Sequence, residues 1–427
     1  MDTFSRRGLL RAGAAGVAGL TLSGTGSRAA GPDATPVDRG RVEGGTVRFD
    51  PVQESRTEPG EEPTPRPLPP GERVGFALVG LGRLTLNQLL PALASCKQAK
   101  ATALVSGDRE KMRLVGRQYG IPEGSQYGYD TFDRIRDNPD VQVVYVVLPN
   151  NMHLEFVTRA ARAGKHVLCE KPMANSSAEA REMIAACAQA NVKLMIAYRC
   201  QYEPNNRAVI RMARTGQYGP PRIIEASNGQ NQAPNDQWRL KRALAGGGAL
   251  PDIGIYCLNA ARYVTGEEPV EVQAQVHSTP GDPRFREVEE AATFLLRFPS
   301  GVLAHCATSY GIHQTKPLRV HTPEAMITLE NAFAYKGQRL RVARLQDGRE
   351  TDTELRIGHK DQFALEMDHM ARCVRENLRP RTPGEEGLAD HVLMEAIFRA
   401  AETGNRVTLD APREKDATRG PEPEQPA

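Results

Sequence analysis

The chain has 427 residues, 40% of them hydrophobic and 25% charged, which is the composition of a folded globular protein long enough for two domains. Aromatic residues make up only 5% and there is a single Trp, which argues against a groove that binds nucleic acid by base stacking. The net charge of +3 is carried entirely by the first 29 residues, so the rest of the chain is neutral and offers no basic field to nucleic acid or anionic lipid.

The N-terminal segment, residues 1–29, has the order of a secretory signal. The basic stretch Ser5-Arg6-Arg7-Gly8-Leu9-Leu10-Arg11 precedes a weakly apolar, Ala/Gly-rich stretch to about Ser23, and the small-residue site Ser27-Arg28-Ala29 follows. The paired arginines predict the twin-arginine type, with cleavage near Ala29, recognition by the twin-arginine export machinery and a periplasmic location. The alternative interpretation is a frayed basic N-terminus.

Residues 30–72 form a proline-rich segment with nine prolines, six glycines and Phe49 as its one aromatic residue. Such a segment cannot bury enough apolar surface to fold alone, so we expect an extended or polyproline-like conformation. Two interpretations remain open: a spacer, or an arm that lies across a neighbouring subunit.

Residues 73–198 alternate between buried strands and amphipathic helices. The continuous apolar run 74–79 is typical of a strand buried on both faces of a parallel sheet, and a helix follows it to about residue 95. This rhythm predicts a Rossmann-type, doubly wound parallel sheet with ligands at the carboxyl ends of its strands. The further strands are expected at 101–106, 141–148, 166–170 and 193–198, and the further helices at 109–119, 153–163 and 178–189.

Residues 199–410 change to a strand-rich pattern that closes with helices at 362–377 and 385–403. The pattern predicts an α+β domain on a large, mostly antiparallel open β-sheet, one face covering a substrate cleft and the other pairing with a second subunit in a homo-oligomer, a dimer or tetramer. The tail 411–427 is expected to be disordered. The strands are expected at 222–228, 270–278, 291–298, 302–309, 318–321 and 325–329.

A dinucleotide motif follows the first strand. In Gly80-Leu81-Gly82-Arg83-Leu84-Thr85 the third glycine of the usual pattern is replaced by Thr85, but the motif lies between a buried strand and a helix, as it should. Gly80 permits the tight turn and Gly82 lets the pyrophosphate approach the helix N-terminus, whereas Thr85 threatens close helix packing.

The end of the second strand selects the type of dinucleotide. An NAD site usually has Asp or Glu there, but this chain has Ser106, with Arg109 and Lys111 nearby. A small hydroxyl beside basic residues suits a 2′-phosphate, so NADP is the predicted cofactor. Asp108 is the counterargument, since a shift of two residues would return a carboxylate to the ribose.

Two further stretches carry candidate catalytic groups. Glu170-Lys171-Pro172 follows the fourth strand, where a group facing the nicotinamide would stand, and a helix opening near Gly246-Gly247-Gly248 would place Asp252 and Tyr256 on one face. A tyrosine, with a pKa of about 10, needs a cationic neighbour such as Lys171 to act as a base near neutrality. The alternatives are a salt-bridged surface lysine, a helix cap and a core tyrosine.

The sequence predicts no metal site and no disulfide framework. Its seven cysteines form no CxxC pair, and its nine histidines show no metal-binding spacing. His153 has two open interpretations: it lines the cofactor cleft, or it is a hydrogen-bonded residue at a helix start.

Between residues 73 and 407 these motifs resemble the glucose–fructose oxidoreductase family, a branch of the superfamily that includes inositol dehydrogenase. Glu170-Lys171-Pro172 is typical of the superfamily, whereas Tyr256 is more telling because most members have His there. The other matching stretches are Val79-Gly80-Leu81-Gly82, Ala103-Leu104-Val105-Ser106-Gly107, Leu148-Pro149-Asn150 with His153, Ala163–Val167, Cys169–Ala174, Tyr198-Arg199-Cys200, Gln237-Trp238-Arg239-Leu240 and Asp252-Ile253-Gly254-Ile255-Tyr256.

The resemblance implies a ping-pong cycle on permanently held NADP, in which an aldose is oxidised to its lactone and a ketose or second aldose is reduced. It implies Tyr256 as general acid/base, Lys171 as the residue that tunes it and orients the sugar, and Asp252 as a hydrogen-bonding partner of the reacting hydroxyl region. It also implies that the proline-rich arm wraps the cofactor of a neighbouring subunit. The cofactor contacts it implies are Gly80, Gly82, Arg83, Ser106, Lys111, Leu148, Asn150, His153, Glu170, Lys171, Arg199, Trp238 and Arg239.

The chain departs from the family pattern at Leu84 and Thr85, where Tyr and Ala are expected, and at Gln201, which replaces a His beside Arg199. These departures concern how tightly the cofactor is bound and which second sugar is accepted. Three functions remain open at this point: the bound-NADP sugar oxidoreductase, a conventional NADP-dependent sugar or polyol dehydrogenase that releases its cofactor, and a non-catalytic dinucleotide or sugar sensor.

Overall fold

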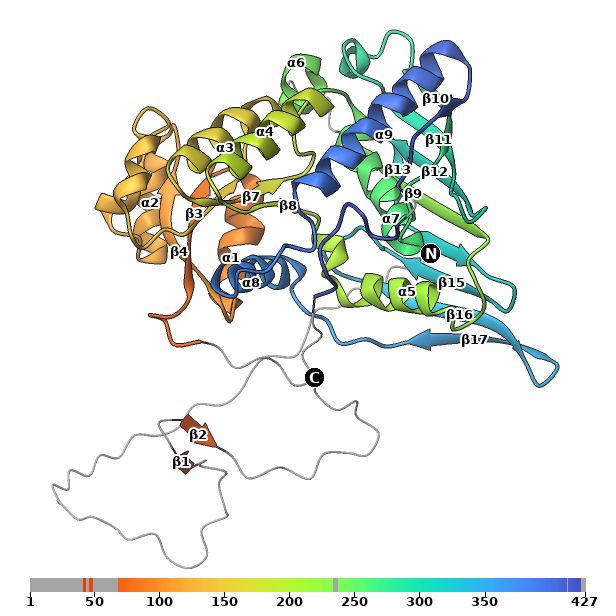
Figure 1. Ribbon diagram of the computed structural model, residues 1–427, viewed down its shortest axis with the longest axis horizontal. Coiled ribbons are helices and arrows are strands. Elements are labelled where there is room, and N and C mark those ends of the chain that lie inside the picture. The colour runs from red at the N-terminus through yellow and green to blue at the C-terminus, as the bar shows by residue number, and fades with distance from the viewer. Residues whose placement is uncertain (1–40, 44–45, 49–67, 233–236, 413, 424–427) are drawn as a thin grey trace, which may run out of the picture. The chain divides into compact units, whose positions relative to one another are not determined.

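The computed structural model describes residues 41–43, 46–48, 68–232, 237–412 and 414–423 (Figure 1). The chain divides into two compact units, Met1–Gly60 and Glu61–Ala427. In the first unit β1 (Arg41–Glu43) pairs with β2 (Thr46–Arg48) as a short antiparallel hairpin. The predicted signal segment and most of the proline-rich arm lie outside the described residues.

The second unit begins with the predicted parallel sheet. Six parallel strands lie in the order β5-β4-β3-β6-β7-β8, so the chain starts in the middle and winds outward in both directions, as a doubly wound sheet does. The strands are β3 (Val74–Val79), β4 (Ala99–Val105), β5 (Gln126–Tyr127), β6 (Val143–Val146), β7 (His166–Glu170) and β8 (Leu194–Ala197).

Both faces of this sheet are covered by helices, which explains why β3 is buried along its whole length. Ala77 and Val79 share a core with α3 (His153–Arg162) and α4 (Ser177–Gln189). Phe76 and Leu78 point to the opposite face, which α1 (Leu90–Ser95) covers together with α8 (Gln362–Arg375). The remaining helix of this region, α2 (Arg109–Tyr119), flanks β4.

Helix α8 comes from the end of the chain yet completes the first domain. Asp368 on α8 accepts hydrogen bonds of 2.7–3.1 Å from the backbone N–H groups of residues 97–99. Helix α8 therefore packs on the parallel sheet although it follows residue 198 in the chain, because the short helix α1 leaves apolar surface of β3 that this later segment covers.

The second sheet is also as predicted, large and mostly antiparallel. Its order is β17-β16-β15-β14-β9-β12-β11-β10-β18, with β13 on β9, and β9 with β12 is its parallel pair. The strands are β9 (Ile223–Asn231), β10 (Glu271–His277), β11 (Ala291–Arg297), β12 (Leu303–Ser309), β13 (Gly311–Thr315), β14 (Leu318–His321), β15 (Ala325–Glu330), β16 (Arg339–Gln346), β17 (Arg349–Leu355) and β18 (Val407–Thr408).

Helices cover one face of this sheet. Side chains along β11 alternate between buried and exposed, the period expected of a strand with a single covered face. The covering helices are α5 (Pro204–Thr215), α7 (Ile255–Thr265) and α9 (Gly384–Thr403), while the short α6 (Arg242–Ala245) precedes α7 (Figure 1).

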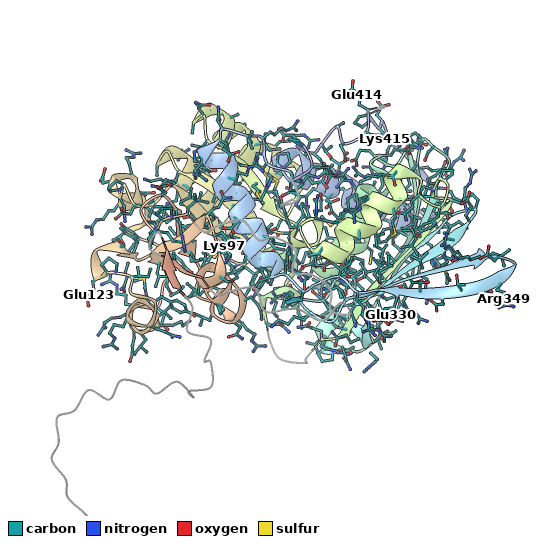
Figure 2. All side chains as sticks on the ribbon, turned by 90° about the horizontal axis from the view of Figure 1, so that it is seen from below. Lys97, Glu123, Glu330, Arg349, Glu414 and Lys415 are labelled. Carbon is teal, nitrogen blue, oxygen red and sulfur yellow. The ribbon has the colours of Figure 1, made fainter. Side chains whose placement is uncertain are left out.

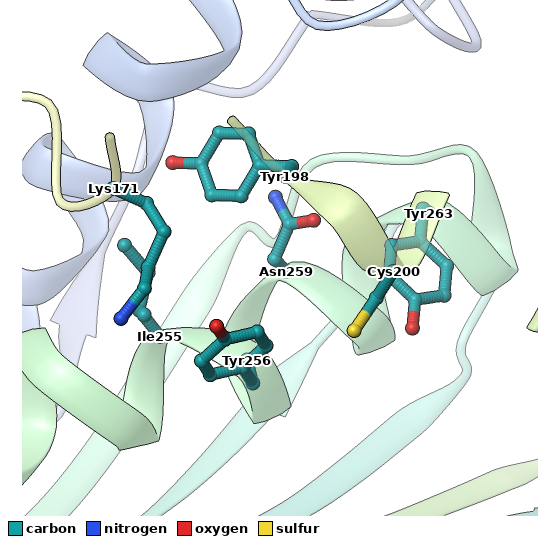
Figure 3. Close-up of a pocket in the computed structure, with 7 residues that line it drawn as sticks. All are labelled: Lys171, Tyr198, Cys200, Ile255, Tyr256, Asn259 and Tyr263. Atoms are coloured by element: carbon teal, nitrogen blue, oxygen red, sulfur yellow. The ribbon is translucent and has the colours of Figure 1, made fainter. Parts of the chain in front are cut away.

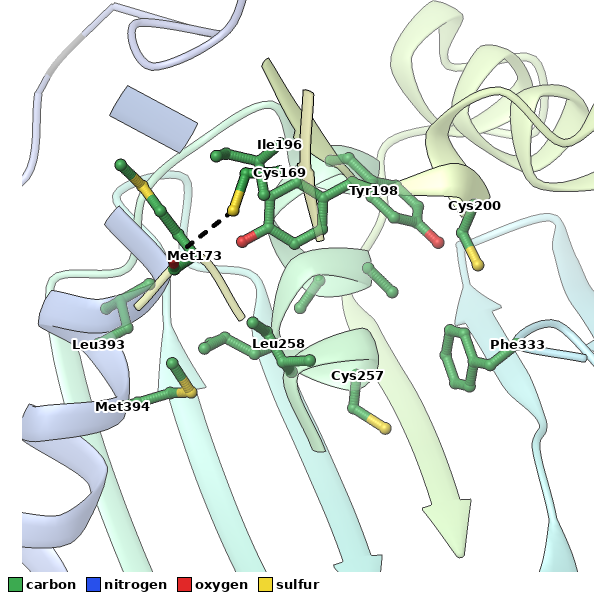
Figure 4. Packing of buried hydrophobic residues seen from close by; sticks show 14 of the residues in the cluster. Cys169, Met173, Ile196, Tyr198, Cys200, Cys257, Leu258, Phe333, Leu393 and Met394 are labelled. Atoms are coloured by element: carbon green, nitrogen blue, oxygen red, sulfur yellow. Dashed lines mark hydrogen bonds between the residues drawn. The ribbon is translucent and has the colours of Figure 1, made fainter. Parts of the chain in front are cut away.

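A single apolar core joins the two sheets and holds the elements that build the site. Cys169 and Ile196 from the first sheet, Leu258 from α7 and Leu393 and Met394 from α9 belong to it (Figure 4). All seven cysteines are free and buried. Among the described residues, no helix is long and apolar enough to cross a membrane.

The C-terminal segment differs from the disordered tail expected from the sequence. In residues 414–423, Asp416 donates a backbone hydrogen bond to Gly266 and the side chain of Arg419 is completely buried. Gly420 passes so close to Pro380 that a Cβ atom there would lie 2.1 Å from its carbonyl oxygen. The segment lies against the protein because its arginine meets buried carboxylates, a long-range partnership that local composition does not reveal.

Candidate active site

A pocket lies where the carboxyl ends of β7 and β8 face the helix α7. Lys171 directly follows β7 and Tyr198 follows β8, at the edge of the parallel sheet where such folds bind ligands. The pocket is a small hollow, and the space around it, open solvent included, amounts to about 230 Å³. Its lining residues are Lys171, Tyr198, Cys200, Ile255, Tyr256, Asn259 and Tyr263 (Figure 3).

Asp252 is held as an anion by its neighbours. The amino group of Lys171 donates to its backbone oxygen at 2.6 Å and to its Oδ1 at 3.3 Å. The Tyr310 hydroxyl donates to Oδ2 at 2.6 Å, and Nε of Arg239 lies 3.3 Å from the same oxygen. Burial alone would raise the pKa of Asp252, but the charges of Lys171 and Arg239 together with the Tyr310 hydrogen bond lower it to about 2.

Tyr256 lies between two cations. Nζ of Lys171 is 4.8 Å from the centre of its ring, and Cζ of Arg199 is 4.9 Å from it. Burial nevertheless raises the pKa of Tyr256 above its usual value, and the charge of Arg199 offsets this only in part. Lys171, the cationic neighbour expected from the sequence, lies beside the ring, but the raised pKa means that the hydroxyl carries its proton at neutral pH.

The chain reaches this geometry through an irregular helix start. Residues Leu250–Gly254 form a π-helical turn that continues into α7, a feature often found at functional sites. The carboxylate of Glu289 accepts the backbone N–H groups of Gly248 and Leu250 at 2.9 Å and so anchors the start of this turn. Asp252 and Tyr256 both reach Lys171, as the sequence predicts.

Arg199 lies against the ring of Tyr256 and is itself held by hydrogen bonds. It donates to the backbone oxygen of Phe333 at 2.8 Å and to Oε1 of Gln362 at 2.5 Å. Its guanidinium also lies 4.6 Å from the ring centre of Tyr335. Because it is buried and fully engaged, Arg199 acts on the site by fixing the position of Tyr256.

The glycine-rich turn after β3 fits a dinucleotide. Gly80 has a φ of +98° and a Cβ there would lie 2.2 Å from the Val147 oxygen, so only glycine is accommodated. A Cβ on Gly82 would point into open space, which leaves room for a phosphate against the backbone at the helix start that exposed Arg83 begins. Thr85 is buried and its hydroxyl donates to the Gly80 oxygen at 2.5 Å, so the third position locks the turn and does not disrupt packing.

The residues at the end of β4 bear on whether the ribose is held by a carboxylate, as in NAD sites, or through a 2′-phosphate, as in NADP sites. Asp108 accepts the backbone N–H of Lys111 at 3.0 Å and thereby caps α2, so its carboxylate is already in use. The hydroxyl of the buried Ser106 accepts the backbone N–H of Asp108 at 3.1 Å. Lys111 itself is 45% exposed, and its Nζ forms a long ion pair of 3.9 Å with Asp108.

Three predicted cofactor contacts near β6 and β7 are buried and partnered within the protein. Nε2 of His153 lies 2.9 Å from the Leu148 oxygen and its Nδ1 lies 3.1 Å from the Pro172 oxygen. This is the second of the two interpretations left open for His153, a hydrogen-bonded residue that ties two loops together. Asn150 donates to the Ala245 oxygen at 2.9 Å, and Glu170 accepts the Tyr145 hydroxyl at 2.7 Å.

Trp238 and Arg239 stand together at the mouth of the site. The Arg239 guanidinium lies 4.4 Å from the indole ring centre of Trp238, and both side chains are half-buried. Trp238, the only tryptophan of the chain, contacts Arg239, and Arg239 pairs with Asp252. The fluorescence of this tryptophan should therefore respond to changes at the site.

Sequence reasoning missed two residues of the site. Tyr310 bonds Asp252 from beyond the end of β12, a contact between distant segments that has no local signal. Asn259 is three residues after Tyr256 on α7, and that helical spacing was the available signal. No cluster of three His, Cys, Asp or Glu side chains suited to a metal ion occurs in the described part of the chain.

The arrangement supports proton transfer beside a dinucleotide. A protonated tyrosine hydroxyl, an ammonium group and a permanently ionised carboxylate converge at the carboxyl edge of a Rossmann sheet. Such a set orients a hydroxyl or carbonyl substrate and moves one proton to or from its oxygen.

The chain was compared with known proteins. Residues 74–198 match the profile of an oxidoreductase family with an NAD-binding Rossmann fold, and residues 206–328 match the GFO/IDH/MocA C-terminal domain. D-xylose 1-dehydrogenase [NADP(+)] of Haloarcula marismortui is 33% identical over 342 residues, which is 79% of this chain and 93% of that protein. The 1,5-anhydro-D-fructose reductase of Ensifer adhaerens is 30% identical over 78% of this chain and 98% of that protein.

Among solved structures, aldose-aldose oxidoreductase from Caulobacter crescentus in complex with glycerol is 46% identical, with a TM-score of 0.76. The match covers 79% of this chain and 100% of that chain. The two matched profiles follow one another along the chain in the same order as its two sheets. The protein is thus a member of the GFO/IDH/MocA family and an oxidoreductase.

Proposed function

We propose that the protein is a sugar oxidoreductase that oxidises an aldose to its lactone and passes the hydride to a second sugar on one tightly held NADP(H). The observation that carries the proposal is the contact of Lys171 with both Asp252 and the ring of Tyr256 at the carboxyl end of β7, in a domain whose glycine-rich turn after β3 fits a dinucleotide. The similarity to aldose-aldose oxidoreductase at 46% identity supports this reaction type.

The residues at the end of β4 favour NADP over NAD. Asp108 is engaged in capping α2, while Ser106 and the partly exposed Lys111 offer a hydroxyl and a positive charge to a 2′-phosphate. When bound, the nicotinamide would take a hydride from one sugar and return it to another, and in its oxidised form it would add positive charge near Tyr256.

Three side chains of this protein handle the sugar. The Tyr256 hydroxyl donates its proton to the carbonyl oxygen of the sugar being reduced and receives one from the hydroxyl of the aldose being oxidised. The ammonium of Lys171 holds that oxygen in place, and the ionised Asp252 fixes Lys171 and accepts from a neighbouring sugar hydroxyl. Because one tyrosine serves both half-reactions, no net proton leaves the site over a full cycle.

A second candidate is a conventional NADP-dependent sugar dehydrogenase that releases its cofactor. The 33% identity to D-xylose 1-dehydrogenase [NADP(+)] favours it. Sorbitol formed from fructose, or an alditol formed from a second aldose, distinguishes the two-sugar cycle from this alternative.

We also propose that the protein is exported by the twin-arginine route and works in the periplasm, although residues 1–29 lie outside the described part. Export after folding would deliver the enzyme with its NADP already bound to a compartment without a nicotinamide pool. The free, buried state of all seven cysteines is compatible with folding in a reducing compartment.

The uncovered face of the large sheet is the proposed contact between subunits. Ile223, Leu295, Leu303 and Met326 are exposed there, an apolar surface that a second copy would bury. Light scattering of the mature protein should give a dimer or tetramer, and a monomer would contradict this.

The test uses mature protein purified without added nucleotide and follows absorbance near 340 nm, where reduced nicotinamide absorbs. Glucose should raise it and a later addition of fructose or a second aldose should reverse the rise. A signal that appears only after NADP is added would favour the conventional dehydrogenase. No response to any sugar with NADP present would overturn both candidates.

A further inference from the structure

The C-terminal segment is connected to the active site by a buried cluster of charged side chains. This cluster has no role in the proposed reaction. We call residues 414–423 the strap. Its Arg419 has a fully buried side chain whose Nε donates to Oε1 of Glu386 at 3.0 Å. Thr418 donates to the other oxygen of the same carboxylate at 2.7 Å.

Glu386, on α9, connects the strap to residues at the wall of the pocket. Its Oε1 also accepts Nδ2 of Asn259 at 2.9 Å and Nε2 of Gln201 at 3.0 Å. Gln201 in turn donates to Oδ1 of Asn259 at 2.9 Å, so both ends of the Asn259 amide are fixed by the cluster. Asn259 lies between Tyr198 and Tyr256 in the pocket (Figure 3).

The same carboxylate also anchors the helix that carries Tyr256. Arg262, two turns from the start of α7, donates to Oε2 of Glu386 at 2.8 Å and to Oδ1 of Asp390 at 2.5 Å. Arg262 and Asn259 therefore both hold α7, the helix that carries Tyr256, to α9. The rotation of α7 about its axis, and with it the direction of the Tyr256 hydroxyl, depends on these bonds.

The strap supplies a positive charge that the cluster needs to balance its buried carboxylates. Three buried carboxylates, Glu268, Glu386 and Asp390, face the guanidinium of Arg262, and Arg419 supplies the second positive charge. Without Arg419 the three carboxylates would share one cation, and Glu386 would have to take up a proton or turn away from Asn259.

We propose that the strap is an integral part of the active-site wall, and that Arg419 is a positioning residue that fixes Asn259 and α7, and hence the hydroxyl of Tyr256, through Glu386. The strap is also anchored by ion pairs that do not involve Arg419, although Asp416 pairs with Arg419 as well, at 3.2 Å. Asp416 and Glu422 pair with Arg214 and Arg381 at 2.5–3.4 Å. These anchors allow Arg419 to be changed while the strap remains docked.

The test compares Arg419→Gln with Arg419→Lys, and with Lys415→Ala as the matched control on the exposed side of the strap (Figure 2). The kcat of the sugar oxidoreductase proposed above should fall roughly tenfold or more in Arg419→Gln, because a small misplacement of a reacting group is costly. Cofactor affinity, followed by the fluorescence of Trp238, should stay within about twofold. Arg419→Lys should recover part of the kcat, and Lys415→Ala should match the parent protein.

Two outcomes would overturn the proposal. One is an unchanged kcat in folded Arg419→Gln. The other is an equal loss of kcat, cofactor affinity and melting temperature in Arg419→Gln and in Glu422→Gln, which would make the strap a general stabiliser. If Arg419→Gln does not fold, Thr418→Val removes a weaker donor to the same carboxylate and should lower kcat by a smaller factor at unchanged cofactor affinity.

A readout independent of activity separates this proposal from the proposed function on which its kcat test rests. Amide hydrogen exchange of Ile255–Thr265 should be faster in Arg419→Gln than in the parent protein and unchanged in Lys415→Ala. Unchanged exchange in both variants would contradict the positioning role even if the protein proved to act on another substrate.

Discussion

Tyr256 is the residue that moves the proton in the proposed reaction. Lys171 and Arg199 flank its ring, yet burial keeps its pKa above the usual value, so the resting hydroxyl is a proton donor. A donor of this kind suits reduction of a sugar carbonyl directly. The reverse half-reaction needs the tyrosinate, which only an added positive charge near the ring would favour.

Replacing Tyr256 by Phe keeps the ring and its two cation contacts but removes the proton. We expect kcat to fall by about 10²–10⁴-fold while the nucleotide remains bound, because general acid–base catalysis contributes that much. The measurement is steady-state turnover together with the nucleotide content of the purified variant. Tyr218→Phe, which does not line the pocket, is the control, and an unchanged rate in Tyr256→Phe would contradict the assigned role.

The sequence pointed to the proposed catalytic residues but not to all of the side chains that hold them. Lys171, Asp252 and Tyr256 were found because short motifs carry them, and the structure brings them together. Tyr310 was missed because it meets Asp252 only through the fold. The role of Lys171 in lowering the pKa of Tyr256 stays a prediction; burial raises this pKa, and the charge that offsets burial in part is that of Arg199.

At the scale of elements, the ends of the first two strands of the parallel sheet define the dinucleotide site. The φ of Gly80 and the close Val147 oxygen shape the turn after β3, while Asp108 caps α2 after β4. These are local features, which explains why the sequence predicted them well.

Ser106→Asp tests the choice of nucleotide. A carboxylate at the end of β4 would repel a 2′-phosphate, so we expect the preference for NADP over NAD to drop at least tenfold, or about 1.4 kcal/mol. The nucleotide released from the denatured protein can be identified by mass spectrometry. Ser106→Ala is the control that removes the hydroxyl without adding charge, and a carboxylate variant that still carries mainly NADP would contradict the assignment.

Elements that depend on distant partners were the ones the sequence did not predict. The hairpin of β16 and β17 was missed although Asp347-Gly348 forms its turn with positive φ at both residues, a recognised hairpin signal. Helix α8 was predicted, but its place on the parallel sheet was not, because it depends on uncovered apolar surface of β3. The strap was expected to be disordered since Glu386, the buried carboxylate that Arg419 meets, is 33 residues away along the chain.

At the scale of the whole molecule, buried neutral histidines limit stability in acid. Burial lowers the pKa of His391 to about 4, and its Nε2 accepts the backbone N–H of Ala174 at 3.0 Å. In the unfolded chain the same group titrates near 6.5. Between these values the unfolded state binds the additional proton, so stability is complete above pH 6.5 and falls as the pH drops toward 4.

His391→Gln keeps an acceptor for Ala174 but cannot be protonated. The loss of unfolding free energy between pH 7.5 and pH 5 should therefore be smaller in this variant by about 2 kcal/mol. Denaturant unfolding at the two pH values measures it. The exposed His313→Gln is the control, and an equal pH dependence in His391→Gln and the parent protein would refute the role of His391.

In the proposed cycle one bound cofactor carries the hydride from the first sugar to the second within the same protein molecule. The most direct test supplies glucose with deuterium at C1, an acceptor sugar and an excess of unlabelled NADPH in solution, and measures deuterium in the reduced product by mass spectrometry. The account predicts one deuterium in each product molecule, undiluted by the free nucleotide. A product without deuterium, or with a content set by the pool in solution, would contradict it.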